Sequence, residues 1–397
     1  MSGPGSYLVG KEERENILEV IDSKYLFRYG DLDDPAFTKK VYTLEREFSN
    51  YIGVNYCVAT VSGTMALYNA LKTLGIGEGD EVLVPGYTYV ASFTAVISVG
   101  AVPVLTEIDE SLTIDPDDIL RKITARTKCI MPVHMIGNSC DMDKIISIAN
   151  KHNLYVVEDC CQAAGASYKG KKVGSFGDFA AFSLNYYKTI TAGDGGLLVT
   201  NDKSLYESAF AFHDQGHIPN RAESAIGNRN IIGLNLRMNE LTGAVALAQL
   251  GKIKSIVETL RNKKNLLKSR IDINPEKEKW RVINDESGEC ASIMTIIFND
   301  SLTAEKVATM LGTVTVSKSG WHVYSNMEHI NNHLEKLSYP NRLGALPVTD
   351  SLLERSVNIS IGVIDGGLGS GFGININSDE DEIISVAAEI NQALASF

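Results

Sequence analysis

Residues 56–106, YCVATVSGTMALYNALKTLGIGEGDEVLVPGYTYVASFTAVISVGAVPVLT, decide the fold. Three short apolar runs in this stretch predict β-strands, and two patterns of helical period lie between them. The strands are Tyr56–Thr60, Glu81–Pro85 and Val102–Thr106, and the helices are Thr64–Leu74 and Val90–Val99. Strands that alternate with helices indicate parallel βαβ units, so the stretch predicts an α/β fold.

The same alternation continues toward the middle of the chain. It predicts four further strands, Cys129–Val133, Tyr155–Glu158, Phe179–Ser183 and Gly196–Thr200, with helices at Asp117–Lys122 and Asp141–His152. We therefore expect seven strands in one mostly parallel sheet that helices cover on both faces. In such sheets, ligands bind beyond the carboxyl ends of the strands.

The sequence pattern changes near residue 250, which indicates a domain boundary. After the amphipathic stretch Asn239–Arg261 the sequence becomes charged and irregular, and weaker strand and helix patterns follow. We predict a large domain over residues 1–250 and a smaller C-terminal α/β domain over residues 251–397. The helical segment Lys11–Ser23 precedes the main alternation and is a candidate to pack on the small domain.

The composition excludes several classes of protein. The chain has 397 residues, and 37 Lys plus Arg against 49 Asp plus Glu give a net charge of −12, which disfavours nucleic acid and anionic membranes as partners. The six cysteines form no CxxC pair, and the N-terminus lacks a signal-peptide pattern. The uncharged stretch 82–105 is broken by Pro85 and Gly100, so it predicts core elements and no membrane span. We expect a cytoplasmic protein with reduced thiols.

The first candidate site is Ser62-Gly63-Thr64, between a strand and a helix. A glycine turn allows close approach of the backbone, and the free N–H groups of a helix start favour an anion such as phosphate. A Ser N-cap before any ordinary helix has the same pattern, so both interpretations stay open.

The second candidate follows the strand at 155–158. Asp159 ends this apolar strand and Gln162 comes three residues later, so both are expected at the ligand-binding edge of the sheet. Asp159 is suited to hold a cationic nitrogen. The alternatives are an N-cap aspartate or a metal ligand.

The third candidate is Lys188. It lies among apolar and aromatic residues, five positions after the strand-end Ser183 and just before the glycine-rich run Gly193-Asp-Gly-Gly196. A desolvated amine has a lowered pKa and forms Schiff bases with carbonyl groups. A surface lysine on a loop is the alternative.

Other residues have simpler interpretations. His322, His329 and His333 suggest a metal, but their spacing is more typical of surface or packing histidines, so we expect no metal site. The glycine cluster 366–371 follows no clear strand-to-helix unit and is interpreted as a loop at the rim of the site. His134 either lines the site or satisfies a buried hydrogen bond.

Together, these segments resemble the fold type I pyridoxal-phosphate enzymes and, within them, the sugar aminotransferases. The resemblance covers nearly the whole chain. Its matching segments are Ser62-Gly63-Thr64, Pro85–Ser92, Val133–Gly137, Glu158–Gln162, Gly174–Asp178, Phe182-Ser183, Lys188, Gly193–Gly196 and Gly233–Met238. Each segment is weak alone, but the ordered set is specific.

The resemblance implies a role for each matching residue. Lys188 is the catalytic lysine that bonds to pyridoxal 5'-phosphate, Asp159 pairs with the pyridine nitrogen, Gln162 faces the ring oxygen O3′, and Tyr89 stacks on the ring. The phosphate is held by Gly63, Thr64 and Ser183, joined by Asn235 from a second subunit. The resemblance thus implies a homodimer with shared active sites, which moves an amino group from L-glutamate to a keto or aldehyde sugar.

The family pattern is broken at two places near the substrate. Leu184 and Asn185 stand where relatives often have an aromatic residue and His, and Phe212–Gly216 replaces an Arg-x-His-Gly run. The sugar is therefore left open. Residues 320–328 faintly resemble the subgroup that aminates C8 of an octulosonate for lipopolysaccharide, to give 8-amino-3,8-dideoxy-manno-octulosonate. Arg237 either meets a substrate carboxylate or supports Asn235.

Three rival functions are disfavoured by the sequence. A pyridoxal-phosphate sugar dehydratase has the same fold, but such relatives typically carry His at the position of Lys188. A non-catalytic regulator built on this fold is disfavoured by the intact Lys188, Asp159 and Gln162. A nicotinamide dehydrogenase would show GxGxxG after its first strand, which this chain lacks.

Overall fold

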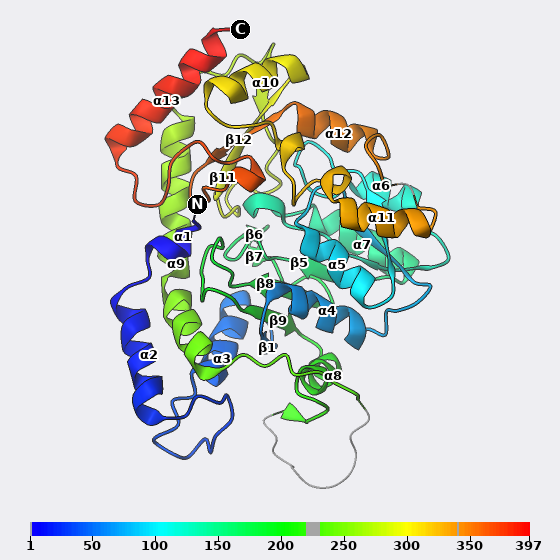
Figure 1. Cartoon of the computed structure of the whole chain (residues 1–397), viewed down its shortest axis with the longest axis vertical. Helices are drawn as coiled ribbons and strands as arrows, with labels where there is room; N and C mark the ends of the chain where they lie inside the picture. Colours follow the sequence, from blue (N-terminus) through cyan, green and yellow to red (C-terminus); the bar gives the residue numbers. More distant parts are fainter. Residues whose placement is uncertain (1, 220–230, 340) are drawn as a thin grey trace.

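The computed structural model describes residues 2–219, 231–339 and 341–397 (Figure 1). A seven-stranded sheet forms the centre, with strand order β1-β9-β8-β5-β4-β2-β3. Its strands are β1 (Tyr56–Thr60), β2 (Glu81–Pro85), β3 (Val102–Thr106), β4 (Thr127–Ile130), β5 (Tyr155–Asp159), β8 (Phe179–Ser183) and β9 (Gly196–Thr200). Neighbouring strands from β8 to β3 are parallel, and β9 is antiparallel to both β1 and β8. This confirms the predicted mostly parallel sheet.

The predicted strand at 129–133 is displaced in the structure. It begins earlier, at Thr127, and ends at Ile130, while Val133 makes only an isolated bridge to Asp159. The regular ladder ends there because Pro132 has no N–H to donate, and Ile136 and Gly137, with positive φ angles of 46° and 84°, then turn the chain away. This early departure matters, since it places residues 133–137 above the edge where ligands bind.

Helices cover both faces of the large sheet. They are α3 (Lys40–Ile52), α4 (Gly63–Thr73), α5 (Val90–Ser98), α6 (Pro116–Lys122), α7 (Met142–His152) and α8 (Lys203–His213). Every residue of β2, β8 and β9 is buried, which is typical of a sheet with a helix layer on each side. Ser62 caps α4 by accepting a hydrogen bond from the Met65 N–H at 3.2 Å, so the helix starts at Gly63, one residue before the predicted Thr64.

A second, smaller sheet lies beyond the long helix α9 (Glu240–Lys268). It is antiparallel and consists of β10 (Glu278–Trp280), β11 (Ile293–Phe298) and β12 (Ser356–Ser360). The helices that follow or flank it are α10 (Ser301–Met310), α11 (Glu328–Lys336), α12 (Pro347–Glu354) and α13 (Glu380–Ala395). Short elements elsewhere in the chain include α1 (Pro4–Tyr7), β6 (Ser167–Tyr168) and β7 (Lys171–Lys172). The domain boundary at 250 stays a prediction; that residue lies inside α9.

The helix α9 runs along both parts of the molecule. In Figure 1, α13 lies beside its C-terminal half, and α2 (Lys11–Ser23) and α3 lie beside its N-terminal half, in agreement with the contacts between these helices. Glu13 on α2 is buried and forms an ion pair with Lys252 of α9 at 2.7 Å. In the described part of the chain, no helix is long and apolar enough to cross a membrane.

Candidate active site

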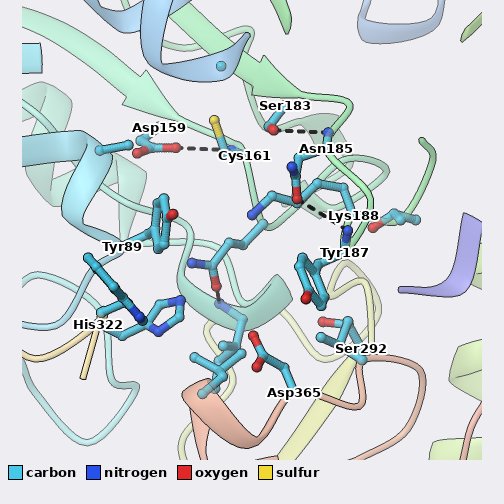
Figure 2. A pocket seen from close by; sticks show the side chains of 18 of the residues that line it. Tyr89, Asp159, Cys161, Ser183, Asn185, Tyr187, Lys188, Ser292, His322 and Asp365 are labelled. Atoms are coloured by element: carbon cyan, nitrogen blue, oxygen red, sulfur yellow. Dashed lines mark hydrogen bonds between the residues drawn. The ribbon is translucent and has the colours of Figure 1, made fainter. Parts of the chain in front are cut away.

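A cavity of about 590 Å³ opens where the carboxyl ends of β5 and β8 meet the N-terminus of α4 (Figure 2). Loops of the second sheet close its other side. The residues that line it are Ser62, Gly63, Thr64, Tyr89, Ala91, Ile136, Asp159, Cys161, Gln162, Ser183, Asn185, Tyr187, Lys188, Thr189, Asp194, Ser292, Ile293, Trp321, His322, Val363, Asp365, Gly367 and Leu368. The cavity therefore brings together all predicted cofactor residues except Asn235.

One end of the cavity is built to receive an anion. Among the described residues, no hydrogen bond uses the N–H groups of Gly63 and Thr64, which stand at the N-terminus of α4. A Cβ at Gly63 would lie 2.8 Å from both Cys161 Sγ and Ser183 Cβ, so only glycine leaves room for the backbone here. The Ser183 hydroxyl oxygen accepts from the Asn185 N–H at 3.2 Å, which leaves its own proton available.

Asp159 contributes a carboxylate that is only 4% exposed. Its Oδ2 accepts from the Ser92 hydroxyl at 2.8 Å, and its Oδ1 accepts from the Cys161 N–H at 3.0 Å. Neither partner is a cation. Because a buried carboxylate is stable only when it is paired or hydrogen-bonded, these donors hold it in place and leave it ready for a cationic group in the cavity.

Gln162 is oriented by the strained segment that follows β4. Its Oε1 accepts from the Ile136 N–H at 3.2 Å, which turns the amide NH₂ group toward the cavity as a donor. Ile136 has φ 46° and ψ 42°, a left-handed conformation that β-branched residues rarely adopt. The surrounding structure keeps it there, since the Ile136 carbonyl accepts from the buried Arg281 guanidinium at 3.1 Å.

Lys188 extends into the cavity toward the ring of Tyr89 (Figure 2). Its Nζ lies 5.8 Å from the ring centroid. The backbone of Lys188 is tied down on both sides: its N–H donates to the Asn185 carbonyl at 3.0 Å, and its carbonyl accepts from the Gly5 N–H at 3.4 Å. The backbone of Lys188 is therefore fixed, and its side chain extends toward the centre of the site.

This arrangement fits pyridoxal phosphate. The N-terminus of α4 suits the phosphate, Asp159 suits the protonated pyridine nitrogen, the Tyr89 ring offers a flat face, and the amine of Lys188 suits the aldehyde. The observation that decides the fit is the space beside the Gly63 backbone, which a Cβ would fill. Fold and site together define a fold type I pyridoxal-phosphate-dependent enzyme.

The comparison with known families narrows this class. Residues 9–363 match the model of the DegT/DnrJ/EryC1/StrS aminotransferase family. The chain belongs to this family, and it is a pyridoxal-phosphate-dependent sugar aminotransferase, as the resemblance implied.

Named relatives agree with the assignment. The chain is 40% identical to the GDP-perosamine synthase of Escherichia coli O157:H7 over 266 residues, which cover 67% of this chain and 70% of the relative. It is 42% identical to the dTDP-3-amino-3,6-dideoxy-alpha-D-galactopyranose transaminase of Aneurinibacillus thermoaerophilus over 243 residues, 60% of this chain and 62% of that one. The crystal structure of an aminotransferase from Psychrobacter cryohalolentis matches with a TM-score of 0.81 at 26% identity, covering 98% of this chain and 97% of that structure.

The three histidines predicted to be surface or packing residues do not lie together: two are exposed and one is buried in the cavity wall. His329 and His333 are exposed on α11 and do not join His322, which is buried and lines the cavity. The His322 ring lies 5.3 Å from the Tyr89 ring, and its Nδ1 lies 3.1 Å from the Ser319 hydroxyl. Burial and the positive charge of Lys188 lower the pKa of His322 to about 3, so this imidazole is neutral.

Sequence reasoning missed two groups near Lys188. Ser292 and Asp365 lie far away in sequence and reach the cavity only because the second sheet packs over it (Figure 2). Residues 2–5 are buried behind the Lys188 loop, and a Cβ at Gly3 would lie 2.2 Å from the Tyr187 carbonyl carbon. The two glycines of Gly3-Pro4-Gly5 were the available signal for this close approach.

Asn235 and Arg237 lie outside the cavity of their own chain. Asn235 is exposed, and its Oδ1 accepts from the Arg237 N–H at 3.4 Å. Arg237 forms an ion pair with the buried Asp214 at 2.6 Å and lies over the Phe27 ring at 5.5 Å. Of the two interpretations of Arg237, these contacts favour support of the Asn235 segment.

His134 satisfies buried hydrogen bonds and does not line the cavity. Its Nδ1 accepts from the Cys140 N–H at 3.0 Å, so the proton is on Nε2, which donates to Glu158 at 3.1 Å. Glu158 also accepts from three N–H groups of residues 174–177, each at 2.8 Å. Donor atoms of His134, Glu158 and Cys160 lie within 4.8 Å of one another, but both histidine nitrogens are already used, so this cluster carries no metal proposal.

Proposed function

We propose that the enzyme transfers the amino group of L-glutamate to a keto or aldehyde carbon of a sugar in the cytoplasm. The sugar is nucleotide-linked or free, and its product serves a cell-surface polysaccharide, lipopolysaccharide or a secondary metabolite. The observation that carries the proposal is the position of the Lys188 amine, 5.8 Å from the Tyr89 ring in the cavity that also holds the buried Asp159 carboxylate.

We propose these roles for the cofactor residues. Pyridoxal phosphate, when bound, supplies an aldehyde that takes up the amino group and a ring that stores the electron pair of the substrate carbon. Asp159, as an anion, keeps the ring nitrogen protonated, and the Gln162 amide donates to the ring oxygen. Gly63, Thr64 and Ser183 donate hydrogen bonds to the phosphate, and Tyr89 covers the ring face.

We assign the proton transfers to Lys188. With pyridoxal phosphate bound, Lys188 would hold its aldehyde group, and the freed Nζ would carry a proton between the substrate carbon and the cofactor. The same amine reverses these steps when the keto sugar is aminated. The fixed Lys188 backbone restricts this movement to the side chain.

We also propose a homodimer in which Asn235 completes the partner's phosphate site. An exposed apolar surface surrounds this residue: Ile232 is 95% exposed, and Leu234, Val61 and Phe27 are each more than 40% exposed. Val61 is joined to this segment, since its N–H donates to the Leu236 carbonyl at 3.0 Å. Exposed apolar patches of this kind mark protein interfaces, and this one adjoins the cavity at Ser62.

Mixing two inactive variants tests the shared site. Lys188→Ala and Asn235→Ala chains, unfolded together and refolded, form mixed dimers in which one site has both Lys188 and the partner's Asn235. We expect activity to reappear in the mixture and to be absent from either variant alone. An active monomer, or no recovery when mixed dimers are present, would contradict the shared site.

Addition of L-glutamate to the purified enzyme tests the reaction itself. We expect a visible absorbance band of bound pyridoxal phosphate that L-glutamate bleaches, because the amino group passes to the cofactor. A visible band that L-glutamate leaves unchanged would point to another amino donor or to the sugar dehydratase. Failure of the protein to acquire any band on reconstitution would refute the role of Lys188.

A further inference from the structure

The segment that follows β4, residues 133–137, contacts two of the cofactor residues; we call it the turn segment. The His134 N–H donates to the Asp159 carbonyl at 3.0 Å, and the Ile136 N–H donates to Gln162 Oε1 at 3.2 Å. Ile136 lines the cavity, as do Asp159 and Gln162. The position of the turn segment therefore determines the direction in which the Gln162 amide points.

The turn segment has a conformation that its sequence does not favour. Ile136 has φ 46° and ψ 42°, in the left-handed region. A branched side chain disfavours this region, whereas glycine adopts it freely. Backbone strain of this kind persists only where the surrounding structure holds it. Contacts from outside the turn segment are therefore needed to keep Ile136 in place.

Arg281 supplies such contacts from the C-terminal part of the chain. It directly follows β10, and its backbone N–H donates to the Thr295 carbonyl of β11 at 3.1 Å. Its guanidinium donates from Nη1 to the Met135 carbonyl at 3.4 Å and from Nη2 to the Ile136 carbonyl at 3.1 Å. Arg281 is only 4% exposed, so both hydrogen bonds are shielded from water.

The guanidinium of Arg281 makes few other contacts that would explain its burial. Among the described residues, it donates hydrogen bonds to these two carbonyls alone, and its Nε has no partner. The carboxylate of Glu289, whose charge acts on Arg281, forms its ion pair with Lys264. Burying a charged group costs free energy, and an apolar side chain of similar size is often more stabilising. A rigid fork of donors, by contrast, fixes two successive carbonyls at once.

We propose that Arg281 is a positioning residue that acts on the cofactor through the turn segment and Gln162. The guanidinium holds Ile136 in its left-handed conformation, and the Ile136 N–H in turn fixes Gln162 Oε1. The Gln162 NH₂ group is thereby kept in the direction of the cofactor's ring oxygen O3′. Arg281 does not line the described cavity, so it acts only through these residues. The proposal rests on the proposed function, in which Gln162 donates to O3′.

The pH titration of the visible band of bound pyridoxal phosphate reports on this hydrogen bond. A donor to O3′ makes this oxygen a weaker acceptor, so the proton that it shares with the Lys188 nitrogen is released at a lower pH. We expect Gln162→Met to raise the midpoint of the titration by about one pH unit or more. Arg281→Met should raise it in the same direction, by up to that amount.

Arg261→Met is the matched control. The Arg261 side chain also donates to a backbone carbonyl, that of Glu289, at 2.7 Å, and it makes no described hydrogen bond to the turn segment. We expect this variant to lose a hydrogen bond of the same kind and to keep the wild-type midpoint. Thermal unfolding of each variant without cofactor measures the accompanying change in stability.

Two double variants separate positioning from a general loss of stability. When Arg281→Met is combined with Gln162→Met, the midpoint should equal that of Gln162→Met alone, because Arg281 acts only through Gln162. When Arg281→Met is combined with Ile136→Gly, the midpoint should equal that of Ile136→Gly alone, because glycine keeps the left-handed conformation without support. A general loosening of the fold would give additive shifts in both double variants.

Additive shifts would overturn the role of Arg281, and so would a wild-type midpoint in Arg281→Met while Gln162→Met is shifted. If Arg281→Met does not fold, Arg281→Gln, whose shorter side chain cannot reach both carbonyls, should show the same shift, and its wild-type midpoint would overturn the role equally. An unchanged midpoint in Gln162→Met would refute the role of Gln162 and this proposal with it. Failure of the proposed function is a separate result, because L-glutamate then leaves the wild-type band unchanged.

Discussion

The two sides of the cavity are built in different ways. On the cofactor side, Asp159 and Ser183 end strands of the large sheet and Gly63 begins helix α4, each within a short local motif. On the side formed by the C-terminal part of the chain, Ser292, His322 and Asp365 stand outside the helices and strands, and His322 packs against Tyr89. The first side is set by local geometry that the fold class shares, and the second depends on how distant segments pack.

The largest effect should come from the cofactor side. Lys188→Ala removes the amine that carries the proton, so we expect the rate of the L-glutamate half-reaction to fall by at least about 10²–10⁴-fold. The protein should still fold, with the unfolding temperature of the wild type. Lys203→Ala, at a side chain that is 73% exposed, is the control. Turnover at the wild-type rate would refute the assignment of Lys188.

Gly63→Ala should weaken the hold on the phosphate. The added Cβ would lie 2.8 Å from Cys161 Sγ and Ser183 Cβ, so the backbone at residue 63 or these two side chains must shift. Overpacking typically costs about 1–3 kcal/mol, and we expect the Kd for pyridoxal phosphate to rise about 10- to 100-fold. Titration of the visible band measures it. Gly251→Ala, where a Cβ meets no atom within 4 Å, should leave the Kd unchanged; an equal rise in both variants would contradict this role of Gly63.

Gly3→Ala tests whether the buried N-terminal segment positions Lys188. The new Cβ would lie 2.2 Å from the Tyr187 carbonyl carbon and oxygen, so either residues 2–5 or the Lys188 loop must move. Because small displacements of catalytic groups lower rates strongly, we expect kcat to fall about tenfold, with cofactor occupancy preserved. Loss of the cofactor together with the fold would indicate a structural role only, and a wild-type kcat would exclude positioning.

The fold could be predicted almost completely. The strands at 56–60, 81–85 and 102–106 match the sequence prediction because each is a short apolar run with a turn on either side. The strand predicted at 129–133 lies at 127–130 because Pro132 cannot donate to the ladder, and the turn that follows contains Ile136 and Gly137 at positive φ angles. An isoleucine gives no signal for a left-handed conformation, so periodicity could not find this turn.

The candidate site could be predicted mainly on the cofactor side; on the other side the sequence indicated only the rim loop at 366–371, of which Gly367 and Leu368 line the cavity. The residues around Gly63, Asp159 and Lys188 are recognisable because each belongs to a local motif with its own chemistry. Asp365 gave no such signal, since it lies beside a glycine cluster that reads as a loop. His322 was interpreted as a surface or packing residue because nothing in its neighbourhood shows that residues 321–323 pair with residues 87–90.

The smallest expected effect is on the pH dependence of stability, and it concerns His322, whose pKa is lowered in part by the charge of Lys188. Its pKa of about 3 in the folded protein, lowered by burial and by Lys188, is below the value of about 6.5 expected in the unfolded chain. Below pH 6.5 the unfolded chain therefore gains a proton that the folded protein does not. The folded state loses stability as pH falls from about 6.5 toward 3, by at most about 1.4 kcal/mol per pH unit.

His322→Gln should remove this contribution, so the free energy of unfolding in urea should fall less steeply between about pH 6.5 and 5 than in the wild type. His152→Gln, at an exposed position on α7, is the control and should keep the wild-type slope. The loss of the Lys188 charge in Lys188→Ala should raise the pKa of His322, so the slope should become shallower at the acid end, as pH approaches the folded-state pKa of about 3. A slope near pH 4 that is independent of Lys188 would mean that burial alone keeps His322 neutral, and that Lys188 and His322 are electrostatically separate.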